Sequence, residues 1–157
     1  LYIKVSEVKL LYGPLLACIT ASKKAFEAMI RQNSPDGKTE TFIQRLRTEP
    51  TGKEADAYRL WMQEVLQPLN EKAANALFEN ADLLETDEVE PLLLQLIAHV
   101  SANKVILKGW RNGDTDMGKL PITYPDSLLK YVKTEYSRLK QIQAKLLGFP
   151  RHPNSKL

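Results

Sequence analysis

The longest apolar stretch of this 157-residue sequence lies within PLLLQLIAHVSANKVILKGW, residues 91–110. Apolar side chains would occur almost all round a helix of 3.6 residues per turn here, which predicts a buried helix from about Asp87 to Trp110 at the centre of a bundle. Polar residues, among them Gln95, His99 and Asn103, interrupt the stretch. A bilayer span needs about 20 mostly apolar residues. We therefore interpret this segment as a core helix and not as a membrane span.

Three further segments show helical periodicity, and no strand-like alternation persists. The first covers about 4–32 and is interrupted near Gly13-Pro14, because proline cannot donate to the carbonyl four residues back. The second begins at a capping-box pattern over 51–54, and Pro68 should bend it. The last covers about 125–147, with Gly148 well placed to cap its C-terminus. A shorter amphipathic helix is expected around 42–46.

These patterns predict an all-α, single-domain bundle of four main helices, mostly antiparallel, with short connecting helices. A hydrophobic content of 43% is enough for one compact core. We expect the domain to cover residues 1–148 and residues 149–157 to form a C-terminal tail. Cys18 is the only cysteine, so an intrachain disulfide framework is excluded.

Charge is distributed unevenly along the chain. Residues 1–50 carry a net charge of +3, residues 51–100 carry −7 and residues 101–157 carry +7, for +3 in total. Neighbouring helices with complementary faces explain this pattern, although a basic surface could also meet an anionic one. No nucleic-acid motif accompanies it, so no specific nucleic-acid partner is expected. The basic residues of the last helix, opposite its apolar face, are Lys130, Lys133, Arg138, Lys140 and Lys145.

Two local patterns in the predicted helices involve acidic residues. Six acids fall within residues 79–90, and without further catalytic context they indicate a solvated corner, with Asp87 and Glu88 in the first turn of the following helix. The last helix has an apolar seam that only Glu135 interrupts. The seam consists of Leu128, Val132, Glu135, Leu139, Ile142 and Leu146.

No residue set points to catalysis, a metal or a cofactor. Cys18 falls on the apolar face of the first helix, where a thiol is usually inert. Residues 113–120 resemble a phosphate-binding loop, but Leu120 stands where that loop needs a hydroxyl. The alternation of Asn112, Asp114 and Asp116 lacks the glycine and glutamate of a calcium loop. We therefore expect no catalytic residues, no metal site and no cofactor.

One helix face leaves a ligand-binding alternative open. His99 and Asn103 are four residues apart on the predicted central helix, and Trp110 shares their face. A hydrogen-bonded polar pair inside the bundle is the structural interpretation. The functional interpretation is a small-molecule or enzymatic pocket formed by His99, Asn103 and Trp110.

Five short motifs occur together in this chain: residues 11–15 (LYGPL), 60–62 (LWM), 68–70 (PLN), 80–84 (NADLL) and 96–100 (LIAHV). With them, residues 10–148 resemble a family of uncharacterised, mostly bacterial, helical proteins. In that family the domain often follows an N-terminal membrane segment and a charged linker, so the resemblance implies a tether upstream of Leu1. It implies no activity.

Together these observations favour a helical protein–protein interaction domain rather than an enzyme, with a protein partner or self-association. It would be the soluble, intracellular part of a membrane-tethered protein if the tether exists. The last three residues, Ser155-Lys156-Leu157, would be a peroxisomal address only at the true C-terminus of a eukaryotic protein.

Overall fold

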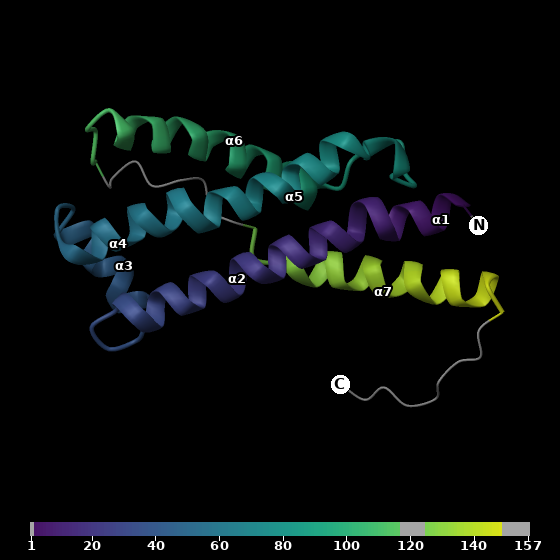
Figure 1. Ribbon diagram of the computed structural model, residues 1–157, viewed down its shortest axis with the longest axis horizontal. Coiled ribbons are helices and arrows are strands. Elements are labelled where there is room, and N and C mark those ends of the chain that lie inside the picture. Colours follow the sequence, from purple (N-terminus) through teal and green to yellow (C-terminus); the bar gives the residue numbers. More distant parts are fainter. Residues whose placement is uncertain (1, 117–124, 149–157) are drawn as a thin grey trace.

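The computed structural model describes residues 2–116 and 125–148, which form helices and loops without any strand. The predicted all-α class is confirmed for these residues (Figure 1). Three parts of the chain lie outside the described residues. They are Leu1, residues 117–124 in the predicted loop before the last helix, and the predicted tail over 149–157, which includes Ser155-Lys156-Leu157. The elements are α1 (Tyr2–Ser6), η1 (Glu7–Tyr12), α2 (Gly13–Asn33), α3 (Thr39–Thr48), α4 (Lys53–Trp61), η2 (Met62–Leu66), α5 (Gln67–Glu79), η3 (Ala81–Leu83), α6 (Pro91–Arg111) and α7 (Leu128–Leu146).

Both internal prolines are accommodated without a break in the helix. The segments η1 and η2 are π-helical turns that directly precede Gly13-Pro14 and Gln67-Pro68. In each, the last amide donor before the proline bonds five residues back, from Gly13 to Val8 and from Gln67 to Met62. The wider turn leaves room for the proline ring, which has no N–H to donate to the carbonyl four residues back. Helical structure therefore runs on over residues 2–33 and 53–79.

Two apolar clusters form the interior. The first lies where η1, the start of α2, the end of α5, the start of α6 and α7 meet, around Leu15, Leu96 and Val132. The second lies among the end of α2, α3, α4, η2 and the end of α6, around Phe42 and Trp110. In Figure 1, α2 and α5 run side by side along the molecule; α2 contributes to both clusters, whereas α5 contributes to the first only.

Buried polar residues occur between the two clusters. Along the chain, four of them fall between residues of one cluster and residues of the other, and His99 directly precedes Val100, the last residue of the first cluster on α6. The amide Nε2 of Gln67 donates to the Val100 carbonyl at 3.1 Å and so joins α5 to α6 at this level. These residues are Ser22, Gln67, Asn70, His99 and Asn103.

The helix over residues 91–110 differs from the prediction in two respects. It begins at Pro91, not Asp87, since proline is favoured in the first helical turn and disfavours helix at the residue before it. Nor is it the central helix: Leu94 and Val105 are exposed, and α6 lies along one edge in Figure 1. The predicted cap at Gly148 is confirmed by its positive φ of 70° and a bond to the Lys145 carbonyl.

Candidate functional site

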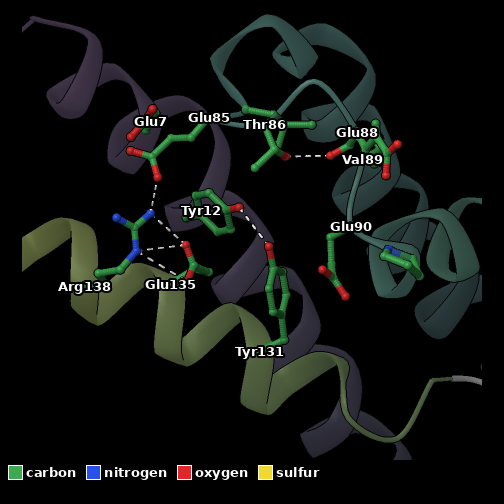
Figure 2. Close-up of a pocket in the computed structure, with 12 residues that line it drawn as sticks. Glu7, Tyr12, Glu85, Thr86, Glu88, Val89, Glu90, Tyr131, Glu135 and Arg138 are labelled. Carbon is green, nitrogen blue, oxygen red and sulfur yellow. Dashed lines mark hydrogen bonds and ion pairs between the residues drawn. The ribbon is translucent and has the colours of Figure 1, made fainter.

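A cavity of about 350 Å³ opens at the end of the molecule where η1, the loop before α6 and α7 meet (Figure 2). We call it the acidic pocket, because five of its twelve lining residues are glutamates and one is an arginine. Its volume is at the lower end of the range for ligand sites. The lining residues are Glu7, Tyr12, Leu84, Glu85, Thr86, Glu88, Val89, Glu90, Pro91, Tyr131, Glu135 and Arg138.

The π-helical turn brings two of these side chains to the pocket. Glu7 and Tyr12 are the first and last residues of η1. In an α-helix, residues five apart point about 140° away from each other. Hydrogen bonding from residue i to i+5 instead places them near the same face. The sequence feature that allows this turn is Gly13-Pro14, because a Cβ on Gly13 would lie 2.6 Å from the Val8 carbonyl oxygen.

Two tyrosines meet in the middle of the pocket. The hydroxyl oxygens of Tyr12 on η1 and Tyr131 on α7 are 3.3 Å apart and share one hydrogen bond. Burial, followed by this hydrogen bond, raises the pKa of Tyr12 well above its usual range, and burial also raises the pKa of Tyr131. Both phenols are therefore neutral at physiological pH.

An ion-pair network closes one side of the pocket. Arg138 donates from Nε and Nη2 to Glu135, at 3.1 and 2.8 Å, and from Nη2 also to Glu85. Lys4 pairs with the same Glu85 and lies 3.3 Å from Glu7 Oε2. The hydrogen bond to Glu135 raises the pKa of Arg138. Glu85 thus fastens the loop before α6 to both α1 and α7.

Glu7 stands out among the pocket carboxylates because only 2% of its surface is exposed. Its buried Oε2 makes no hydrogen bond to a described residue, although Lys4 is within ion-pair distance. A buried carboxylate without a full set of hydrogen bonds is costly, since it has lost hydration without equivalent replacement. Because this oxygen is buried and faces Lys4, Glu7 adds negative charge to the pocket wall and is not an open acceptor.

The pocket has more negative than positive charge. Its five glutamates face Arg138 in the lining and Lys4 beside it, which leaves a formal excess of three negative charges. The excess is concentrated on the side of Glu88 and Glu90, because no cation of the described residues forms an ion pair with either one. Figure 2 shows Glu90 on the opposite side of the tyrosine pair from Arg138. This arrangement is suited to bind a cation.

The acidic residues do not make a metal site. In the described ranges, 2–116 and 125–148, no group of three or more His, Cys, Asp or Glu side chains is arranged to hold a metal ion. Nor do the pocket residues include a serine, cysteine or histidine that could pair with a base as an activated nucleophile. The lining residues supply charge, hydrogen-bonding groups and two phenol rings.

The structure brings together two of the three residues predicted for a ligand pocket. His99 and Asn103 are buried on α6, with His99 Nε2 and Asn103 Nδ2 3.3 Å apart. Trp110 lies farther along the helix in the second apolar cluster, where its ring packs edge-on against Tyr58 with centroids 6.0 Å apart. The acidic pocket is bounded by other residues and by the first cluster.

The basic residues of α7 fall into two groups. Lys130, Lys133, Lys140 and Lys145 are exposed, and Lys140 donates to Gln143. Arg138 is instead held by Glu135 and Glu85 in the acidic pocket. It is therefore engaged with carboxylates of its own chain.

The sequence contained signals for some of the pocket residues. Glu135 was the single interruption of an apolar seam, and such an interruption indicates a partner inside the fold. The acidic run was expected to be a solvated corner, and all its acids except the half-buried Glu90 are exposed. What the sequence did not show is that Glu85, Glu88 and Glu90 also line the pocket. Glu7 and Tyr12 gave no signal, because α-helical periodicity separates them.

No protein family model, no curated protein and no solved structure matches this chain. Among the described helices, none has the length and apolar character required to traverse a bilayer.

Proposed function

We propose that this chain is a helical protein–protein interaction domain that receives a positively charged side chain of its partner in the acidic pocket. The observation that carries the proposal is the cavity itself: five glutamates surround a tyrosine pair, and no cation in residues 2–116 or 125–148 forms an ion pair with Glu88 or Glu90. Excess charge of one sign in a recess concentrates field lines and attracts the opposite charge. The lining supplies charge and hydrogen-bond acceptors and includes no serine, cysteine or histidine, which supports a binding role.

The wall of the pocket suits recognition because it is fixed from several directions. Arg138 and Lys4 hold the loop before α6, and the π-helical turn fixes Glu7 and Tyr12. Groups held in advance reduce the ordering cost of binding.

The proposal also includes a mostly antiparallel arrangement of the four long helical segments. The hydrogen bond from Asn80 Nδ2 to the Leu10 carbonyl supports it, because this bond joins the end of α5 to the beginning of the first segment.

A labelled peptide containing lysine and arginine, compared by fluorescence anisotropy with a peptide carrying norleucine at the same positions, tests the proposal. We expect the basic peptide to bind and the neutral one to bind at least about tenfold more weakly. The double substitution Glu88→Gln/Glu90→Gln should remove this preference. Glu64→Gln, an exposed glutamate on η2, is the control and should retain it. Equal binding of both peptides, or unchanged binding by the double variant, would refute the proposal.

A second candidate is a small-ligand site at His99, Asn103 and Trp110. It is favoured by one observation: Asn103 Oδ1 and Trp110 Nε1 are buried and form no hydrogen bond among the described residues. His99→Gln separates a ligand-binding role from a structural one. If the role is structural, stability falls modestly and peptide binding is kept. If a ligand binds there, its binding is lost at nearly unchanged melting temperature.

A further inference from the structure

Building on the proposed function, we infer that the group received in the acidic pocket is the primary ammonium of a lysine side chain and not the guanidinium of an arginine. The inference depends on which acceptors the pocket leaves open, on how they are spread around it and on its apolar lining.

The carboxylate that could best receive a guanidinium is already occupied. Arg138 donates from Nε and Nη2 to Glu135 Oε2, and its Nε also lies 3.4 Å from Glu135 Oε1, so both oxygens of this carboxylate are engaged. Glu85 is shared between Arg138 and Lys4. A guanidinium from a partner would have to displace these intramolecular pairs.

The open acceptors are separated from one another. They are the carboxylates of Glu88 and Glu90 on the loop before α6 and the lone pairs of the two tyrosine hydroxyls, on η1 and α7. Figure 2 shows them around the cavity on different elements. A guanidinium presents its donors in one rigid plane, whereas an ammonium has three donors that rotate about the terminal bond. Separated acceptors therefore suit the ammonium.

The rest of the lining fits a lysine stem. Leu84, Val89 and Pro91 provide apolar surface next to the acceptors. A lysine can place its four-carbon stem along such a surface while its charged end reaches the carboxylates. Glu85, Thr86 and Glu88 are exposed at the outer edge, so a strongly hydrated ammonium keeps part of its water.

The test uses one alanine-based peptide with lysine, arginine or norleucine at a single central position. Isothermal titration to the full chain at low salt gives the affinity of each, and circular dichroism confirms that every variant is folded. We expect the lysine peptide to bind at least about fivefold more tightly than the arginine peptide and more than tenfold more tightly than the norleucine peptide. In Glu90→Gln the preference for lysine over arginine should shrink, whereas Glu64→Gln should keep it.

The outcomes distinguish the two proposals. Arginine binding as well as or better than lysine would overturn the assignment to an ammonium and leave the cation-binding pocket intact. Norleucine binding as well as both would overturn the assignment and the proposed function together. A lysine preference that persists in Glu90→Gln and in Glu88→Gln would place the ammonium outside the acidic pocket and also overturn the inference.

Discussion

The hydroxyl groups of Tyr12 and Tyr131 lie 3.3 Å apart, although the residues are 119 positions apart in the sequence. This bond connects the first long helical segment to α7 across the acidic pocket. Removing either hydroxyl should lower the free energy of unfolding, because the remaining one loses its partner in a partly buried place.

A double-mutant cycle measures this connection. Tyr12→Phe and Tyr131→Phe, alone and together, should show a coupling free energy of about 0.5–1.5 kcal/mol in urea denaturation. Strictly additive effects of the two substitutions would mean that the hydroxyls do not interact in solution.

Alkaline pH should destabilise the protein through Tyr58. Burial between Phe42 and Trp110 raises the pKa of Tyr58 to about 12 from its ordinary value of 10.0. Between these pH values the unfolded chain loses the phenolic proton and the folded chain keeps it. The unfolded state therefore binds fewer protons, so stability that is present below pH 10 is lost as the pH rises toward 12.

Comparison with Tyr58→Phe isolates this effect from the titration of lysines. Urea midpoints measured at several pH values should fall more steeply above pH 10 for the wild type, by up to about 1.4 kcal/mol per pH unit. Parallel pH profiles for the two proteins would show that Tyr58 is not buried as described.

Burial in the first apolar cluster can be tested at Leu96. Its side chain is completely buried, so Leu96→Ala should lower the free energy of unfolding by about 2–5 kcal/mol through lost transfer energy and a new cavity. Lys140 on α7 is exposed, and Lys140→Ala should change stability by less than about 0.5 kcal/mol. Similar losses in a denaturant titration would contradict the assignment of α6 to this cluster.

The π-helical turn before Pro14 can be tested at Gly13. Alanine in place of glycine normally stabilises a helix by about 0.5–1 kcal/mol. At Gly13 the added Cβ would lie 2.6 Å from the Val8 carbonyl oxygen, so Gly13→Ala should instead destabilise by about 1–3 kcal/mol.

Gly109 on α6 is the matched control for Gly13. The nearest atom to a Cβ at that position is 3.8 Å away, in Asp114, so Gly109→Ala should show the usual stabilisation. If thermal melts give the same positive shift for both glycines, residues 7–13 form an ordinary α-helix.

How far the sequence reveals this molecule depends on which interactions set each feature. Periodicity was sufficient for the all-α class and for the C-terminal cap at Gly148, because both depend on local spacing. It failed at Asp87 because Pro91 determines where α6 begins. The apolar pattern also led to the wrong prediction that α6 is the central helix. Hydropathy counts apolar side chains, but it does not show that some of them, such as Leu94 and Val105, remain exposed.

The acidic pocket could be only partly foreseen. Glu135 and the acidic run are visible in the sequence, but their meeting with Glu7 and Tyr12 depends on tertiary contacts. The π-helical turn changes the angular position of every residue after it, so a count of 100° per residue places Tyr12 away from Glu7. By contrast, the contact between His99 and Asn103 follows from their spacing of four residues on one helix.

The central claim is that the acidic pocket binds an organic cation, and the aromatic NMR signals of Tyr12 and Tyr131 test it most directly. The chain is titrated with n-butylammonium chloride, a fragment of the lysine side chain, against sodium chloride at equal ionic strength. We predict saturable shifts of both tyrosine signals with the ammonium only, and their loss in Glu88→Gln/Glu90→Gln. Identical shifts with the two salts, or shifts that persist in the double variant, would contradict the claim.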